Sequence, residues 1–377
     1  MMQQRPLVLS YFKSSMPRKR FVRLLLAAGA RPIPAFGRVV QMNSHRFVVT
    51  LFCTAIVLAL IGCSDDHGVP STQPSDKTPA QVARFSDYDS AVMSVAFSPD
   101  GKLLATSTEQ RTVIVWDWQA KKRVLSLKDA GYLCVIMPDS RTLAVCDSGI
   151  LSTWDLTTGK KLRQFGYDVD GGYSFAPTGR DGILLCGGRA GLTLWDLRTG
   201  EWANPTIPAL EPGAHCADVS PGGRFAVSGS ADGSVRVWSL QTGAETAKLH
   251  DKVRWFESVA ISPDGRYVLA SSSDDESIRL WDMQTQKIVR RFKASAPTPR
   301  CTAFSPDGSR FMFTDCQVVH LWDLNADREI CQLKGHEVQI EAVCFSPDGI
   351  YAATASGVQD LAGRRYDTTA RVWRLPK

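Results

Sequence analysis

The chain has 377 residues, of which 44% are hydrophobic and 22% charged, and these ordinary proportions exclude a wholly disordered protein. The net charge of +6 is uneven, because residues 1–46 contain nine Lys or Arg residues and no acidic residue. The remaining chain carries 35 basic and 38 acidic residues, a net charge of −3 that does not suit a phosphate backbone. We therefore expect no nucleic-acid partner.

Residues 1–41 are rich in arginine and precede a second methionine, Met42. We interpret them as an N-terminal extension that is non-native or unstructured, with Met42 as the true initiator. Their arginine-rich, acid-free composition is also similar to that of an organellar transit peptide, and that alternative stays open.

Residues 42–62 have the parts of a secretory signal peptide. A short basic start ending at Arg46 precedes sixteen nearly apolar residues, 47–62, which are too few for a comfortable membrane span. The ending Leu-Ile-Gly-Cys at residues 60–63 resembles the lipobox of bacterial lipoproteins. In that family the cysteine becomes the new N-terminus and carries two or three acyl chains, enough for stable anchoring. The resemblance implies lipidation at Cys63 and a chain held in the bacterial cell envelope, facing the periplasm or the exterior.

Two other interpretations of this region stay open. Residues 42–62 can be an ordinary signal peptide or signal anchor, with Cys63 a bystander. If residues 1–63 are not native, the rest of the chain is a cytoplasmic protein. In either case residues 64–80, rich in Ser, Asp, Pro and Thr, have too little apolar surface to order themselves. Together with Cys63 they are expected to form a flexible linker, 63–80, ahead of the folded part.

Seven tryptophans recur at near-constant intervals through the rest of the chain. They are Trp116, Trp154, Trp195, Trp238, Trp281, Trp322 and Trp373, at intervals of 38, 41, 43, 43, 41 and 51 residues. Aspartate follows all of them except Trp238 and Trp373. A period near forty residues indicates one supersecondary unit repeated, because a single unit cannot bury its own apolar face. We therefore expect one large repeat domain and not two or three average ones.

The first repeat predicts four short strands. Residues 91–97 alternate apolar with small or polar residues, as a half-buried strand does, and the turn Ser-Pro-Asp-Gly follows at 98–101. Further strands are expected at residues 102–107, 112–117 and 123–127. The same turn sequence recurs at residues 262–265, 305–308 and 346–349. Four short strands separated by such turns are typical of one propeller blade.

The Trp-Asp endings, the Phe-Ser-Pro-Asp-Gly phrases and Gly335-His336 make residues 81–377 similar to the WD-repeat family of β-propellers. The resemblance implies an all-β fold, a seven-bladed β-propeller of four-stranded antiparallel blades. The last repeat lacks a fourth strand of its own after Trp373, while residues 81–85 form a strand-like run without a partner. We expect this N-terminal strand to complete the last blade, because closure removes the exposed ends of a repeat array.

In the WD-repeat family, a structural hydrogen-bond tetrad joins a histidine, a serine or threonine, an aspartate and a tryptophan within one blade. The resemblance implies a full set in the seventh blade alone: His336, Thr354, Asp367 and Trp373. The fourth and fifth blades keep three members each, Ser228, Asp232 and Trp238, and Ser271, Asp275 and Trp281. We therefore expect His336 to be a structural residue and not a catalytic one.

The sequence contains no recognisable catalytic or metal-binding motif. Its six histidines are scattered without metal-ligand spacing, and neither a Gly-x-Ser-x-Gly elbow nor a phosphate-binding glycine loop is present. Eight cysteines in the repeat region stand singly, mostly within expected strands, as buried residues do, although one disulfide stays open in an exported chain. We expect a monomeric, non-enzymatic propeller without a metal or a cofactor.

Binding of a protein or peptide partner is the function that remains. In WD-repeat proteins, the loops before the first strand and between the second and third strands share one face, often the partner-binding face. On that face we expect Arg254, Trp255 and Phe256, because Trp and Arg are enriched in binding hot spots. An insertion at residues 356–367 explains the 51-residue interval and supplies further candidates, Arg364, Arg365 and Tyr366.

Each candidate has an alternative. Trp255 can pack against its own blade, and the insertion at residues 356–367 can be disordered. The competing class of function is a propeller enzyme or small-molecule binder that uses the central channel. Such proteins place His, Asp or Glu from several blades around the axis, and the sequence shows no sign of that convergence.

Overall fold

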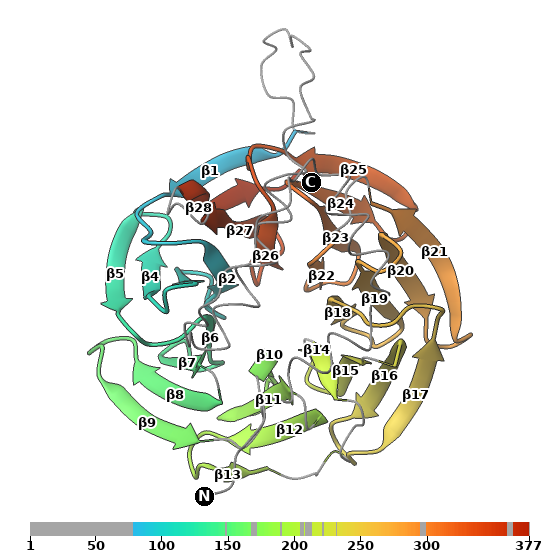
Figure 1. Ribbon diagram of the computed structural model, residues 1–377, viewed down its shortest axis with the longest axis horizontal. Coiled ribbons are helices and arrows are strands. Elements are labelled where there is room, and N and C mark those ends of the chain that lie inside the picture. Colours follow the sequence, from blue (N-terminus) through green and yellow to red (C-terminus); the bar gives the residue numbers. More distant parts are fainter. Residues whose placement is uncertain are drawn as a thin grey trace, which may run out of the picture. The chain divides into compact units, whose positions relative to one another are not determined.

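The computed structural model describes the propeller region of the chain. The described residues are 78–147, 149–166, 172–188, 191–203, 207, 213–220, 222–230, 232–294, 299–359 and 365–376. All regular structure in these ranges is β-strand, arranged as seven four-stranded antiparallel sheets around a ring (Figure 1). The prediction of an all-β, seven-bladed propeller is therefore confirmed.

The first four blades each consist of four consecutive strands. Blade 1 contains β2 (Val92–Phe97), β3 (Leu103–Thr108), β4 (Val113–Asp117) and β5 (Lys122–Leu127). Blade 2 contains β6 (Leu133–Ile136), β7 (Thr142–Asp147), β8 (Ile150–Asp155) and β9 (Lys161–Gly166). Blade 3 contains β10 (Gly172–Pro177), β11 (Ile183–Gly188), β12 (Gly191–Asp196) and β13 (Glu201–Trp202). Blade 4 contains β14 (Ala214–Val219), β15 (Phe225–Ser230), β16 (Ser234–Ser239) and β17 (Glu245–His250).

The last three blades complete the ring. Blade 5 contains β18 (Ser258–Ile261), β19 (Tyr267–Ser272), β20 (Ser277–Asp282) and β21 (Lys287–Lys293). Blade 6 contains β22 (Thr302–Phe304), β23 (Arg310–Asp315), β24 (Val318–Asp323) and β25 (Arg328–Leu333). Blade 7 contains β26 (Ile340–Phe345), β27 (Tyr351–Gln359) and β28 (Arg365–Arg374), and its outer strand is β1 (Ala80–Phe85).

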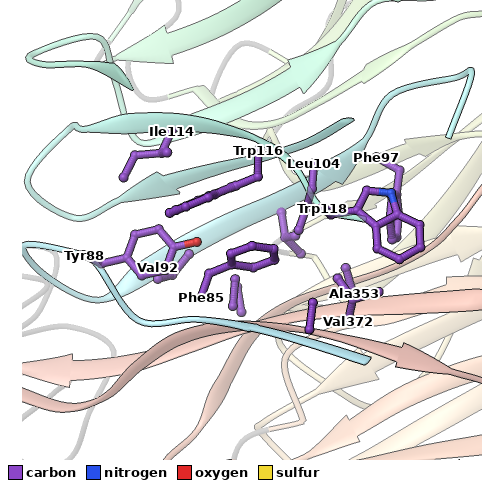
Figure 2. Close-up of a cluster of buried hydrophobic side chains, with 14 residues drawn as sticks. Phe85, Tyr88, Val92, Phe97, Leu104, Ile114, Trp116, Trp118, Ala353 and Val372 are labelled. Carbon is purple, nitrogen blue, oxygen red and sulfur yellow. The ribbon is translucent and has the colours of Figure 1, made fainter. Parts of the chain in front are cut away.

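The N-terminal strand closes the ring, as predicted. β1 pairs antiparallel with β28, so that Ala80 lies opposite Arg374 and Phe85 opposite Ala370. Figure 2 shows how the seam between the last and first blades is packed, with Phe85 from β1 beside Trp116 from β4. The two ends of the repeat array therefore share one sheet, which leaves no open blade to cap.

The hydrophobic core lies between neighbouring blades. Among the described residues it divides into seven clusters, each combining side chains from two adjacent blades. The recurring tryptophans contribute to these clusters. Trp373, for example, is 4% exposed between blades 6 and 7. Because a blade buries its apolar face only against its neighbours, the repeats stabilise one another around the ring.

Candidate interaction surface

Trp255 lies half-buried in the loop that leads into β18. Its indole Nε1 donates to Glu257 Oε1 at 2.9 Å, and Ser273 Oγ donates to the same oxygen at 2.6 Å. Ser272 Oγ donates to the backbone carbonyl of Trp255 at 2.9 Å. Part of the ring is accessible while its orientation is already set, which lowers the entropic cost of ordering it in a complex.

The prediction that Phe256 contacts a partner is wrong, because its side chain is fully buried. It has 0% exposure and lies in the core between blades 4 and 5. The guanidinium carbon of Arg279, which is also fully buried, lies 5.5 Å from the centroid of the Phe256 ring. Trp255 and Phe256 are adjacent in the loop before β18, yet only Trp255 keeps part of its side chain at the surface.

Arg254 is exposed beside Trp255, as predicted for a surface residue of this face. Its backbone N–H donates to Asp274 Oδ2 at 3.3 Å, and its Nε lies 4.0 Å from Asp274 Oδ1. Asp274 belongs to the turn between β19 and β20. The loop before the first strand and the turn after the second strand of blade 5 therefore meet at this point.

The predicted insertion at residues 356–367 is strand at both of its ends. β27 and β28 continue to pair past a bulge near Ser356, and Val358 lies opposite Tyr366 in this extension. The extra residues of the last repeat therefore lengthen a hairpin, and the prediction of a loop from 356 to 367 is wrong at its boundaries.

The three candidate residues of this hairpin fall in different places. Tyr366 is 38% exposed. Arg365 is the first residue of β28, and Arg364 lies outside the described residues.

The inner strands β18, β22 and β26 lie around the centre of the ring (Figure 1). Charged side chains at or just before the starts of these strands come close together, with one more from blade 1. Arg300, which precedes β22, pairs with Glu341 of β26, and Arg300 Nη1 lies 2.6 Å from Glu341 Oε2. Two more carboxylates lie nearby. The charge of Glu257 acts on the pKa of Glu341, and the charge of Glu341 acts on the pKa of Glu109. We call these four residues the inner carboxylate cluster. Blades 1, 5, 6 and 7 each supply one of them.

The inner carboxylate cluster carries more negative than positive charge, three carboxylates against one guanidinium. Burial raises the pKa of Glu341, and Arg300 offsets only part of that rise. Burial also raises the pKa of Glu109, and the charge of Glu341 adds to the effect. His215, near Glu257, has a pKa lowered by burial. A cationic group brought to this cluster would relieve the repulsion among its carboxylates.

Sequence reasoning missed this convergence. Glu257 and Glu341 stand singly near the starts of inner strands in two different repeats, and no local motif joins them. The signal available was a charged residue near the start of an otherwise apolar inner strand. Such residues form a cluster only when the ring brings the starts of these strands to one face.

The structure brings the four predicted tetrad residues together in blade 7. His336 Nδ1 lies 2.7 Å from Asp367 Oδ2, and His336 Nε2 lies 2.7 Å from Thr354 Oγ1. Trp373 Nε1 donates to Thr354 Oγ1 at 2.9 Å. Burial lowers the pKa of His336 despite the opposing effect of Asp367. A buried histidine with both ring nitrogens engaged is suited to holding blade 7 together.

The other blades hold weaker versions of this network. In blade 4, Trp238 Nε1 donates to Ser228 Oγ at 3.1 Å. In blade 5, Trp281 Nε1 and Ser271 Oγ are both buried without a hydrogen-bond partner. Blade 5 instead holds the fully buried Arg279, which pairs with two aspartates, Asp251 and Asp275. The polar network is therefore degenerate, and packing between blades holds most of the ring.

The described residues contain no group of three or more His, Cys, Asp or Glu side chains arranged to hold a metal ion. No helix in that part of the chain is long and apolar enough to cross a membrane. The thiols of Cys134, Cys186, Cys216, Cys301, Cys331 and Cys344 are free, and the first three of these are buried. Cys63 and the proposed signal peptide at 42–62 lie outside the described residues.

Comparison with known proteins finds similarity to one repeat family. The family described as WD domain, G-beta repeat matches the chain at residues 79–117, 211–239, 247–282 and 327–374. The Schizosaccharomyces pombe protein named Target of rapamycin complex subunit wat1 is 30% identical over 168 residues, 42% of this chain. Protein groucho of Drosophila melanogaster is 29% identical over 203 residues, 52% of this chain.

The chain matches only part of each relative, 53% of the length of the first and 22% of the second. The four matched segments include strands of blades 1, 4, 5, 6 and 7, and each of them ends at or soon after a recurring tryptophan. These segments of the propeller are therefore similar to WD repeats.

Proposed function

We propose that this chain is a non-enzymatic scaffold that binds a protein or peptide partner through the face bearing Trp255 and the inner carboxylate cluster. The observation that carries the proposal is the position of Trp255, half-exposed and held by Glu257 beside a surplus of negative charge. An aromatic anchor beside desolvated charge is typical of binding hot spots. A partner segment with a lysine or arginine fits this chemistry, because its charge would balance the carboxylates. One similar protein is named as the subunit of a complex, which supports an interaction role.

In this proposal the chain works in the bacterial cell envelope. Residues 42–62 direct export and are removed, Cys63 carries the lipid anchor, and residues 63–80 tether the propeller to the membrane. The lipobox-like ending at residues 60–63 supports the proposal. Residues 1–41 play no part in it.

The anchor is tested by mass spectrometry of the mature protein expressed from Met42 in a bacterial host. We expect an acylated cysteine at the N-terminus and loss of membrane association in Cys63→Ser. A mature chain that retains residues 43–62 would contradict the lipid anchor. It would have no bearing on the proposed binding face.

The binding face is tested by proximity labelling in the native membrane, followed by titration of purified candidates. Trp255→Ala is expected to weaken binding by about thirtyfold, which corresponds to roughly 2 kcal/mol at a hot spot. Glu257→Gln should weaken binding of a cationic segment, because it removes a negative charge. For the same reason it should not make the binding affinity more dependent on salt concentration. Val289→Ser, an exposed position on the outer strand β21, is the control and should bind normally. Equal binding by wild type, Trp255→Ala and Glu257→Gln would place the partner elsewhere.

A second candidate is a small-molecule site at the centre of the ring. The observation in its favour is the convergence of Glu109, Glu257 and Glu341 from three blades, with His215 nearby. A thermal-shift screen with small cationic metabolites separates the two proposals. A ligand whose stabilisation is lost in Glu109→Gln but kept in Trp255→Ala would favour this candidate.

A further inference from the structure

The outer strands of blades 1 and 2 begin with the same arrangement of charged and apolar side chains. In each of them lysine or arginine residues precede one apolar residue, and all seven are exposed: Lys121, Lys122, Arg123 and Val124 in blade 1, and Lys160, Lys161 and Leu162 in blade 2. The apolar residues stand at the β-bulges of β5 and β9, where Val124 is 49% and Leu162 is 53% exposed. We call these seven residues the basic rim.

The other five blades form without this arrangement. The residue opposite the recurring tryptophan and the residue before it are Arg123 and Lys122 in blade 1, and Lys161 and Lys160 in blade 2. The equivalent pairs of the other blades contain at most one cation each: Trp202 and Glu201, Glu245 and Ala244, Ile288 and Lys287, Glu329 and Arg328, and Gln81 and Ala80. Strand pairing therefore does not need two cations at this place, and their presence indicates a role at the surface.

The two halves of the basic rim lie next to each other. The turn that leads into β9 packs against β5, and a Cβ added at Gly159 would lie 2.8 Å from Leu125 Cδ1. Gly159 directly precedes Lys160, and Leu125 directly follows Val124. β5 and β9 also follow one another along the outer edge of the ring, whereas β21 lies across the ring from them (Figure 1). The basic rim is therefore one sector of the edge of the propeller.

Positive charge is in excess on the basic rim. Among its five cations, Arg123 pairs with Asp87. Asp117 lies opposite the start of β5. Asp155, at the turn before β9, is balanced by Arg141, whose Nε lies 3.1 Å away. Five cations beside the carboxylates of Asp87 and Asp117 leave an excess of three positive charges, so the electrostatic complement of this sector is an anionic surface.

The N-terminal strand lies beside this sector. Phe85, at the end of β1, packs against Trp116 of blade 1, and Asp87 follows two residues later and pairs with Arg123. Residues 63–80, the proposed membrane tether, lead into β1. The tether and the basic rim are therefore attached to neighbouring outer strands.

The chemistry of the basic rim suits a bilayer surface. Lysine and arginine attract anionic lipid headgroups, and apolar side chains among them enter the boundary between headgroups and acyl chains. The aliphatic part of a lysine lies along apolar surface while its ammonium group stays with water and phosphate. An acidic protein would match the charge alone, whereas a membrane also accounts for the neighbouring tether.

We propose that the basic rim rests on the surface of a membrane that contains anionic phospholipids. Val124 and Leu162 enter the headgroup region, and the cations around them lie against phosphate groups. The propeller then stands on its edge, so both of its faces, including the one with Trp255, stay open to partners. This proposal rests on the proposed function for the tether that brings the propeller to a membrane, but the contact itself does not require lipidation of Cys63.

The test uses the chain from Ser64 onward, which contains every strand of the ring and lacks Cys63. It is mixed with vesicles of phosphatidylcholine alone, or of phosphatidylcholine and phosphatidylglycerol in equal parts, and bound protein is measured by flotation. We expect binding to the anionic vesicles only, and weaker binding as salt is added. Each basic side chain near an anionic surface contributes about fivefold in affinity, so Lys122→Gln combined with Lys160→Gln should weaken binding about twentyfold.

Two single variants separate charge from apolar contact. Lys121→Gly should weaken binding about fivefold without harming the fold, because Lys121 has a left-handed backbone (φ 54°) where blade 2 carries Gly159. Leu162→Ser should weaken binding by about fivefold or more, since an apolar contact with the bilayer is lost.

The matched controls are in blade 5, across the ring from the basic rim. Lys287→Gln combined with Lys293→Gln removes two exposed cations from β21 and should leave binding unchanged. Val289 occupies the same bulge position in β21 as Leu162 does in β9 and is 57% exposed, so Val289→Ser should also bind like wild type.

Three outcomes overturn the proposal. The first is equal binding to both kinds of vesicle, or binding to neither. The second is binding to anionic vesicles that the Lys122→Gln and Lys160→Gln double variant retains in full. The third is binding to polyglutamate but not to vesicles, which would assign the basic rim to an acidic protein. If the chain from Ser64 binds anionic vesicles while Cys63 is not acylated in cells, the basic rim is supported and only the lipid anchor is contradicted.

Discussion

Phe85 and Trp116 pack against each other at the point where the ring closes, with ring centroids 4.6 Å apart and an angle of 30° between the rings. Phe85 ends the strand that completes blade 7, whereas Trp116 is the recurring tryptophan of blade 1. The same contact therefore joins the last blade to the first and holds the N-terminal strand in place.

Replacing Phe85 with alanine should destabilise the propeller by about 3 kcal/mol, because a buried aromatic side chain is lost and a cavity is left at the seam. Chemical denaturation monitored by tryptophan fluorescence measures the effect. Arg84→Ala, on the exposed side of the same strand, is the control and should change stability by less than about 0.5 kcal/mol. Removing residues 80–85 altogether should cause aggregation or a much lower Tm. An unchanged Tm in that deletion would show that closure does not depend on β1.

The tetrad of blade 7 should make stability fall in acid. Burial by itself would raise the pKa of Asp367, but the hydrogen bond and charge of His336 outweigh it and hold the pKa well below its usual range. A carboxyl whose pKa is lower in the folded state stabilises the fold above its ordinary pKa and loses this effect as the pH falls. We therefore expect wild-type stability to drop below about pH 4, where an unfolded aspartate begins to bind its proton.

The variant Asp367→Asn isolates this contribution. It should cost about 3 kcal/mol at pH 7, because it removes the charge that Arg371 and His336 face in the interior. Its loss of stability between pH 5 and pH 3 should be smaller than that of wild type by a measurable margin, about 1 kcal/mol or more. Thermal melts across this pH range check both parts. Parallel pH curves for the two proteins would assign the acid sensitivity to other carboxyls, such as Asp251, whose pKa is also lowered.

Asp218 should have the opposite effect on stability. Its carboxyl lies at the junction of β14 and β18, where burial raises its pKa to about 6. A carboxyl whose pKa is raised by folding favours the folded state while protonated, and this advantage is lost as the pH rises from about 4 through 6. Asp218→Asn should therefore stabilise the propeller by about 1 kcal/mol at pH 7.5 and by little at pH 4, as urea denaturation would show. A destabilised variant at pH 7.5 would mean that the bond from the Ile261 N–H to Asp218 matters more than the charge.

Trp255→Ala should leave the fold nearly intact. The side chain is half-buried, and its ordered hydrogen bond is to Glu257 on the surface and not to a core group. We expect a loss of about 1 kcal/mol or less, whereas Phe256→Ala should cost about 3 kcal/mol or more because Phe256 is fully buried. Differential scanning fluorimetry on the two variants makes the comparison. Equal losses would identify Trp255 as a core residue and weaken its proposed role in binding.

Much of the fold could be predicted because its signals are local. The turn at residues 98–101 and the alternation at 91–97 predict β2 and β3 to within a residue or two, and the same pattern repeats. The unpaired strand at 81–85 also had a single place to go, since only the last blade lacked an outer strand. Backbone hydrogen bonding leaves few alternatives to such a pairing.

The candidate site was predicted only in part. The positions of Arg254 and Trp255 followed from the loop that precedes β18, but a sequence does not say which of two adjacent aromatic residues turns inward. The extension of β27 and β28 depends on pairing between residues such as Val358 and Tyr366 across a bulge. Register of this kind is decided by both strands together, not by either one alone.

The sequence by itself determined the number of blades and the strand pattern within each blade, and its resemblance to the WD-repeat family implied the residues of the tetrad. The number of blades and the strand pattern rest on periodic signals and on pairing between neighbours in the chain. Tertiary structure alone decided that Glu257 and Glu341, from blades 5 and 7, come close enough together for the charge of one to affect the pKa of the other. The physical reason is that closing the ring brings together residues of separate repeats. Burial and charge at such a junction depend on both blades at once.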